Sequence, residues 1–402
     1  MRKFLLGALT VATVTLIVIA AALPFAAPPL AKRIAEEKLA AFGFPATVTM
    51  RLGYCWRKGP EIGGTLSVAL ADGPWRIRAD FGAGFGEWHA RVKMDETAFS
   101  ESDPTIGRLL ADHPIEAVSN LTFSGSIALD ASVERTRRIP VPVWSAKAPL
   151  RNVSAKLMAN DRPYEVNGLS ITPGASGIAD QRTISPMFPR ISSVSAAGFV
   201  LTNVYASVRA TETSLMINEA GAGLCGGKVN LYSVFLNPTN LNAGLTLFVD
   251  DVDAGKTLSH LNGFRGKASG RLHGKVKLFV REGGKAVRLS DAFLYSTPGE
   301  VGNLQMENPK VITDNLALAG LDDDFQGNVR NALSNLDYTV LKLNLKRGPN
   351  NQATLAVRLS GTATRGDLTV PVDLNVNING ELEQMINTGL GLSSKLQKGK
   401  QP

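Results

Sequence analysis

Apolar and polar residues alternate along much of the chain, most regularly near its C-terminal end. Between residues 367 and 379, every second position is a large apolar residue: Leu368, Val370, Val372, Leu374, Val376 and Ile378. A period of two places these side chains on one face of a β-strand. Burying six of them would contribute roughly 9–18 kcal/mol, at about 1.5–3 kcal/mol each. The sequence therefore predicts a strand whose apolar face needs a cover.

The same alternation recurs upstream, most clearly after residue 199. Its apolar positions are Val229, Leu231, Phe235, Leu245, Leu247, Val249, Leu272, Val276, Leu278, Val280, Leu341, Leu343, Leu345, Leu355 and Val357. Weaker strand patterns cover residues 46–52, 65–71, 75–80, 87–94, 120–134 and 150–159. We expect roughly fifteen strands in all. Strict alternation is typical of antiparallel strands with one face in water.

Helical patterns are few and short. They cover residues 30–42, 103–111, 254–261, 323–333 and 381–396. Two proline-rich connectors, residues 139–149 and 185–189, separate groups of strands. Five short helices cannot cover every apolar face of so many strands. The fold class is therefore mainly β, either as two sheets packed in a sandwich or as one long, curved sheet with an apolar interior.

The N-terminal segment is apolar enough to enter a membrane. Residues 4–23 carry no charge, and about 20 helical residues at about 1.5 Å each span the hydrocarbon core. A cleavable signal peptide is the alternative, although its apolar region is usually shorter. We favour an uncleaved anchor, with Arg2 and Lys3 in the cytoplasm. The chain is then a single-pass membrane protein whose bulk faces outward.

Charge and cysteine content exclude several functions. The net charge of +8 over 402 residues is modest, and no basic stretch with interleaved aromatic residues predicts nucleic-acid binding. Cys55 and Cys225 are the only cysteines. They could pair in an exported protein, but unpaired, buried thiols are the favoured interpretation. Neither has a His or a second Cys at metal-ligand spacing.

Isolated motifs give no catalytic site. Residues 221–226 fit the dinucleotide pattern G-x-G-x-x-G, but a strand pattern follows where that motif needs a helix. We interpret them as a glycine-rich turn. The acidic runs at 250–253 and 322–324 precede helices and are expected to cap them. His273 lies on the polar side of its strand, so we expect it to face solvent. No residue is predicted to be catalytic, to bind a cofactor or to bind a metal, and we do not expect an enzyme, although a hydrolase with unusual motifs remains open.

The order of several short blocks resembles a known family. The blocks are residues 226–229, 236–238, 268–275, 293–299 and 332–338, followed by the alternating stretch that ends at residue 379. In order and spacing they resemble the C-terminal region of the YdbH-type members of the AsmA-like family. The resemblance covers residues 195–390. The members of that family are envelope proteins thought to conduct lipid between membranes.

This resemblance implies an elongated antiparallel sheet that forms an apolar groove for acyl chains. The alternating apolar residues named above, from Val229 to Ile378, would line it. The chain would transfer phospholipid-like molecules between the inner and outer membranes. The domains would be an anchor (residues 1–27), an N-terminal β-rich periplasmic region (28–190), a C-terminal YdbH-like β-groove region (191–396) and a flexible basic tail (397–402).

The resemblance also suggests partners and an alternative. The final strand could bind an outer-membrane lipoprotein or a second copy through its free edge, although Pro371 is expected to break or bulge its pairing. The family carries a dicarboxylate-transport label, which we discount because one membrane span cannot form a solute carrier. The alternative function is a structural or interaction protein for outer-membrane assembly, with a closed β-sandwich core.

Overall fold

The structure is a computed structural model. It describes residues 28–41, 45–56, 60–71, 73–106, 121–159, 162–196, 199–211, 213–237, 240, 242–259, 266–281, 286–307, 323–348, 352–365 and 368–381. In these residues no helix is long and apolar enough to cross a membrane. The predicted anchor (residues 1–27), the predicted last helix and the basic tail lie outside them.

The 22 described strands are antiparallel, as the sequence predicts, and outnumber the roughly fifteen that we expect from it. They belong to one large sheet, which is one of the two arrangements that the sequence leaves open. The chain divides into two compact units. Unit 1 comprises Met1–Ala197 and Tyr205–Glu212, and unit 2 comprises Gly198–Val204 and Thr213–Pro402. Strand β12 (Phe199–Ala210) contributes residues to both units.

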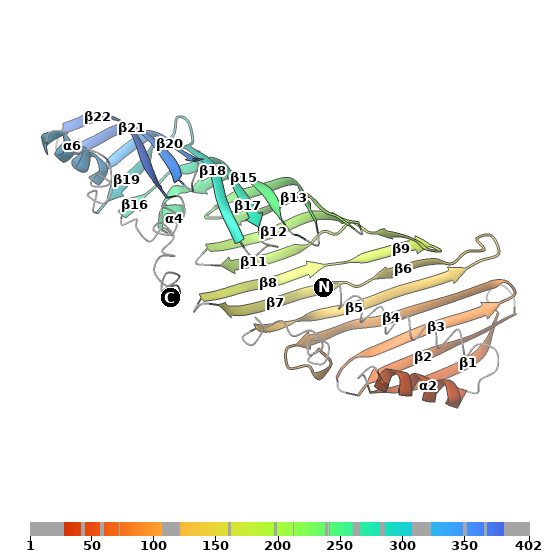
Figure 1. The fold of residues 1–402 in the computed structure, drawn as a ribbon. Helices are drawn as coiled ribbons and strands as arrows, with labels where there is room; N and C mark the ends of the chain where they lie inside the picture. The colour runs from red at the N-terminus through yellow and green to blue at the C-terminus, as the bar shows by residue number, and fades with distance from the viewer. Residues whose placement is uncertain are drawn as a thin grey trace, which may run out of the picture. The chain divides into compact units, whose positions relative to one another are not determined.

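Unit 1 begins with helix α2 (Pro28–Ala41) and a series of antiparallel strands (Figure 1). Its strands are β1 (Ala46–Trp56), β2 (Pro60–Leu70), β3 (Arg76–Gly84), β4 (Glu87–Ser100), β5 (Leu121–Arg135), β6 (Val143–Lys147), β7 (Leu150–Ala159), β8 (Arg162–Ile171), β9 (Gly174–Ile178), β10 (Gln181–Ile184) and β11 (Arg190–Ala196). Strands β1 to β5 pair in chain order. The two halves of β5 then pair with different strands, β6 and β7.

The strands of unit 2 are also antiparallel. Its strands are β13 (Leu215–Leu224), β14 (Gly227–Leu236), β15 (Ala243–Asp253), β16 (Gly266–Ala268), β17 (Arg271–Arg281), β18 (Ala286–Ser296), β19 (Gly302–Met306), β20 (Leu336–Arg347), β21 (Gln352–Arg365) and β22 (Leu368–Glu381). The pairing runs β13–β14–β15–β17–β18–β20–β21–β22, and β16 pairs with β19 beside β20. Helices α4 (Ala254–Ser259) and α6 (Asp323–Ser334) lie against this unit.

Among the described residues, each unit has a larger and a smaller buried apolar cluster, and the larger one packs helix against sheet. In unit 1, Ala35 and Leu39 of α2 pack onto Val48, Leu66 and strands β3 and β4. In unit 2, the cluster joins α4 and α6 to the sheet and is built around two fully buried residues of β20, Leu336 and Tyr338. Helices therefore cover one end of the apolar face in each unit.

Turns and helix ends agree with the sequence predictions. Cys225 and Gly226 connect β13 to β14 with φ angles of 48° and 80°, which suits a two-residue hairpin turn. The turn expected over residues 221–226 is therefore confined to Cys225 and Gly226, and residues 221–224 belong to strand β13. Asp103 Oδ1 accepts a hydrogen bond from Thr105 N at 2.9 Å, and Asp253 Oδ1 accepts one from Lys256 N at 2.8 Å. Both aspartates cap the helical turns that follow them.

Two expectations are corrected, one for the connector at residues 139–149 and one for Pro371. The proline-rich connector at 139–149 contains a strand, β6, and four further strands occupy residues 162–196. Several of these are only four or five residues long, which is too short to establish a period. Pairing between β21 and β22 continues through Pro371 without a register shift. In an antiparallel pair alternate N–H groups point away from the partner, so we infer that Pro371 stands where no bond to β21 is lost.

Candidate functional site

Apolar residues of unit 2 form continuous rows across its strands. The first apolar row follows directly opposed positions of seven strands: Leu231, Leu247, Val276, Ala292, Leu345, Leu355 and Ile378. The second apolar row lies two residues along each strand: Val229, Val249, Gly274, Leu294, Leu343, Val357 and Val376. Directly opposed residues share a face of the sheet. The pairing register thus joins separate alternating strands into two tracks without a charged residue.

The two ends of these tracks differ in how they are covered. Leu341 is buried in the cluster under α4 and α6, as is Leu272, and Leu343 and Val357 pack against that cluster. Leu345 is buried in a small cluster with Ala353, and Leu355 packs against it. On β14, β15 and β17, eight predicted lining residues are only half-buried and belong to none of the described buried clusters: Val229, Leu231, Leu245, Leu247, Val249, Val276, Leu278 and Val280.

These eight side chains are half-buried and lie outside the buried clusters, so their neighbours on the sheet cover them only in part. Leu245 lies opposite Leu278, and Leu247 lies opposite Val276. In the part of the chain that the structure describes, helix α4 touches β15 and β16, and α6 touches β19 and β21. The apolar face of β14, β15 and β17 is the candidate functional site. We call it the apolar face below.

Two predicted lining residues are exposed. The Phe235 side chain is 66% exposed, whereas its neighbour Val234 is 4% exposed. Strict alternation stops at Ser233, which has a φ of 52°, and a parity count along the sequence cannot detect such a break. Val370 is 51% exposed on the last strand. Val372 and Leu374 of the same strand pack against the α4–α6 cluster. The side chains of Leu368, Val376 and Ile378 lie outside the described residues.

His273 is more enclosed than its polar position suggests. Its side chain is 22% exposed, its Nδ1 lies 2.8 Å from Asp250 Oδ1, and its Nε2 lies 3.0 Å from Thr297 Oγ1. Pairing of β15 with β17 shifts register between Val249 and Val252, and Asp251 there has a φ of 56°. The imidazole therefore ties this bulge to the segment that follows β18.

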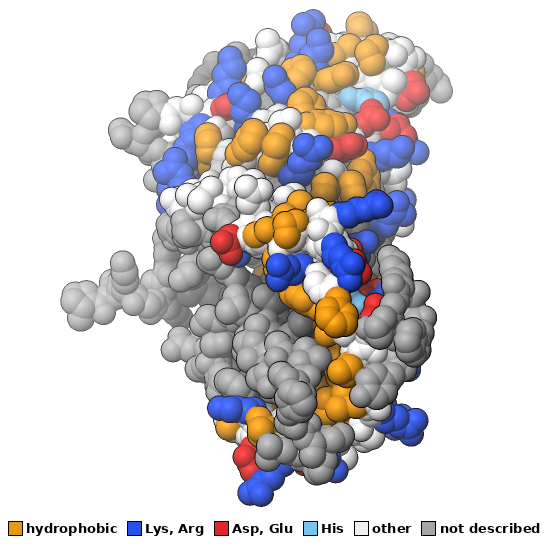
Figure 2. Space-filling model, turned by 90° about the vertical axis from the view of Figure 1, so that its right-hand side faces the viewer, with side chains coloured by type: hydrophobic (Ala, Val, Ile, Leu, Met, Phe, Trp, Pro, Cys, Tyr) orange, Lys and Arg blue, Asp and Glu red, His pale blue; other side chains and the backbone are white. Residues whose placement is uncertain are grey.

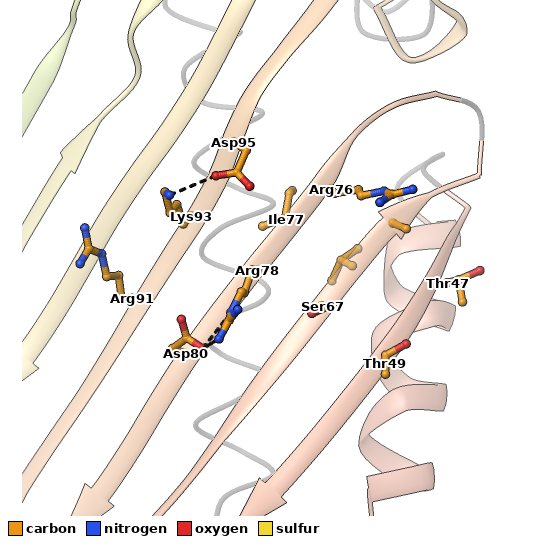
Figure 3. A pocket seen from close by; sticks show the side chains of 12 residues that line it. Thr47, Thr49, Ser67, Arg76, Ile77, Arg78, Asp80, Arg91, Lys93 and Asp95 are labelled. Carbon is orange, nitrogen blue, oxygen red and sulfur yellow. Dashed lines mark hydrogen bonds and ion pairs between the residues drawn. The ribbon is translucent and has the colours of Figure 1, made fainter. Parts of the chain in front are cut away.

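A polar hollow of about 600 Å³ lies over β1 to β4 in unit 1, lined mainly by the polar side chains of these strands (Figure 3). Four of its charged side chains form two ion pairs, Arg78 with Asp80 at 3.0 Å and Lys93 with Asp95 at 3.1 Å. All four are well exposed. Pairs of this kind contribute little to stability or to binding an additional charge. The hollow is therefore a weaker candidate than the apolar face.

Other chemistry finds little support among the described residues. They contain no group of three or more His, Cys, Asp or Glu side chains that could hold a metal ion. Cys225 has a free, half-buried thiol in the β13–β14 turn. Cys55 lies in β1, but its side chain is outside the described set.

Comparison with known proteins identifies no relative of this chain. No protein-family model, no curated protein and no solved structure matches this chain. The resemblance to the YdbH-type proteins therefore stays a prediction from the sequence blocks.

Proposed function

We propose that this chain binds phospholipid-like molecules, with acyl chains along the two apolar rows, and transfers them between the inner and outer membranes. The observation that carries the proposal is the continuity of the rows across seven strands, together with half-burial where β14, β15 and β17 bear them. An acyl chain needs only a continuous apolar surface, because it offers no hydrogen-bonding group.

The dimensions suit this ligand. Seven strands separated by about 4.8 Å make a row about 29 Å long. The hydrocarbon core of a bilayer is about 30 Å thick and holds two acyl chains end to end. A full row is therefore about as long as two acyl chains in line. On β20 and β21 the row residues Leu343, Leu345 and Val357 already pack in or against buried clusters, so the acyl chain is expected on β14, β15 and β17. Apolar surface that is not covered by protein commonly marks the site of a ligand or a partner.

Transfer between two membranes requires the predicted N-terminal anchor and a distal contact. Among the described strands, β22 pairs only with β21, so its second edge could accept a strand from an outer-membrane lipoprotein or from another copy. These partners, and the inner-membrane location with a periplasmic bulk, are part of the proposal. Under it the sheet would be an elongated, curved groove.

Site-specific photo-crosslinking in native membranes tests the lipid-binding step. A photoreactive amino acid at Leu247 should crosslink radiolabelled phospholipid, because this residue lies in the first apolar row. The matched control places the same group at Thr246, the next residue, which lies opposite Lys277 on the other face. Crosslinking at both positions alike, or at neither, would rule out acyl chains on the apolar face.

Charged substitutions separate the proposal from the alternative. Leu278→Asp should abolish lipid binding and transfer while the protein keeps its circular dichroism spectrum and cooperative unfolding. The alternative is a structural or interaction protein for outer-membrane assembly, with a closed core. Burial of Leu272, Leu341 and Leu345 is consistent with it. If Leu278→Asp unfolds the full chain, a packed core is the better interpretation.

A further inference from the structure

The second face of unit 2 carries exposed aromatic side chains, opposite the apolar face. Phe248 and Phe293 flank Lys275 in one cross-strand row of β15, β17 and β18. Their exposed fractions are 44% and 36%. The Tyr232 ring lies 5.8 Å from that of Phe248, and Phe293 lies 5.6 Å from Tyr295. Since these rings are on the polar face, they are not part of the predicted lipid track.

Basic side chains stand among these rings. Lys275, Lys277 and Phe279 alternate along one face of β17, and the Arg281 guanidinium lies 5.7 Å from the Phe279 ring centroid. Strand β20 adds two further exposed lysines, Lys342 and Lys346. On the face drawn in Figure 2, hydrophobic side chains lie among basic and acidic ones. We call the set Tyr232, Phe248, Lys275, Lys277, Phe279 and Phe293 the aromatic–basic face.

Acidic groups only partly balance these cations. Asp291 lies 4.0 Å from Lys277, at the limit of an ion pair. A shallow hollow of about 350 Å³ nearby is lined by Lys275, Lys277 and Lys346 together with Phe293 and Asp291. The charge complement of this face is therefore an anionic surface.

We propose that the aromatic–basic face docks onto the surface of an anionic bilayer. Phenyl and phenol rings are favoured at the level of lipid headgroups, and neighbouring lysines extend toward anionic phosphates. A protein partner fits less well, because lysine is depleted from protein–protein interfaces. A sheet face with only a shallow hollow also suits a broad surface better than one small anion. Docking on this face is independent of lipid occupancy on the apolar face.

Membrane tethering tests this proposal with the full chain. The protein is reconstituted in phosphatidylcholine nanodiscs and mixed with vesicles of phosphatidylcholine alone or with phosphatidylglycerol added, and co-flotation is measured. We expect co-flotation with phosphatidylglycerol vesicles only, and less of it at high salt. Lys275→Glu with Lys277→Glu should weaken it roughly tenfold or more. Phe248→Ala with Phe293→Ala should also weaken it while the salt dependence persists.

Two controls make the outcome decisive. Arg135→Glu with Lys147→Glu reverses two exposed charges on unit 1 and should leave tethering unchanged. An equal loss in this control shows that net charge is responsible and overturns the proposal, as does equal flotation with both kinds of vesicle. Leu278→Asp, combined with the photoreactive group at position 247, should keep tethering while it loses lipid crosslinking, so failure of the proposed lipid transfer can be told apart from failure of docking.

Discussion

The two units share an alternating apolar pattern but differ in how completely its apolar side chains are buried. In unit 1, Ala35 and Leu39 of α2 cover the apolar side of β1 to β4, and Val48 and Val92 there are 0% and 1% exposed. Helix α2 is also tied to β1 by a hydrogen bond of 2.9 Å from Val48 N to Glu36 Oε1. On β14, β15 and β17, equally apolar positions stay half-buried. The difference shows that alternation predicts an apolar face but not what covers it.

The strongest test of the covered face is Val48→Asp. It places a carboxylate where side chains exclude water, and we expect a loss of roughly 3–5 kcal/mol in the free energy of unfolding. Urea denaturation followed by circular dichroism measures it. Thr49→Asp, on the exposed side of the same strand, is the matched control and should change stability little. Similar losses for both variants would show that this face is not sealed.

The corresponding change on the apolar face is Leu247→Asp. Because Leu247 is only half-buried, we expect it to lose about 1–2 kcal/mol of stability, part of the value of one buried leucine. Denaturant midpoints of the lipid-free protein measure this, with Thr246→Asp as the control. If Leu247→Asp is as destabilising as Val48→Asp, the two faces are equally covered and the comparison fails.

Leu39→Ala should convert part of the covered face into an uncovered one. Leu39 is 3% exposed and packs on the unit 1 cluster, so its truncation should lower stability by about 2–4 kcal/mol. An apolar fluorescent dye should then bind unit 1 more strongly. Lys38→Ala removes an exposed neighbour on the same helix and should do neither. An unchanged dye signal in Leu39→Ala would mean that α2 is not the cover.

Local chemistry made some of this predictable from the sequence, and long-range packing hid the rest. Apolar spacing and Pro28–Pro29 predict α2, and Asp103 and Asp253 cap helical turns as expected. The positive φ at Ser233 displaces Phe235, and nothing in the sequence marks that serine as special. The apolar rows could likewise not be predicted from the sequence, because they depend on the pairing register between strands that are distant along the chain. Which faces α2, α4 and α6 cover is set by the same contacts.

Tyr338 tests the covered end of unit 2. Its hydroxyl donates to the Ser269 carbonyl at 2.6 Å, so Tyr338→Phe should lower the free energy of unfolding by about 1 kcal/mol. Burial, followed by the nearby Asp253, raises the pKa of Tyr338 above its usual 10.0. A raised folded pKa means that this stabilisation is complete below pH 10.0 and is lost as pH rises through the folded pKa. The alkaline loss in thermal melts should therefore shrink in Tyr338→Phe, and an identical pH profile would contradict the buried hydroxyl.

The smallest expected effect compares the polar faces of the two units. Arg91 bonds Asp130 at 2.6 Å, whereas Lys277 and Asp291 are 4.0 Å apart. The Arg91 hydrogen bond holds the pKa of Asp130 below its usual 3.8. A lowered folded pKa stabilises the protein above pH 3.8 and loses that contribution as pH falls through the folded value. Asp130→Asn should therefore lower the unfolding midpoint slightly at neutral pH and make no difference in strong acid. Asp291→Asn should change neither, because Lys277 lies at the limit of an ion pair and both groups are exposed. The asparagine oxygen can also still accept the long hydrogen bond from Arg347 N. If the two variants behave alike, the Arg91–Asp130 pair contributes no more than the Lys277–Asp291 pair. The polar faces of the two units would then not differ in how far their ion pairs are formed, and this reason for placing anionic lipid on unit 2 would be lost.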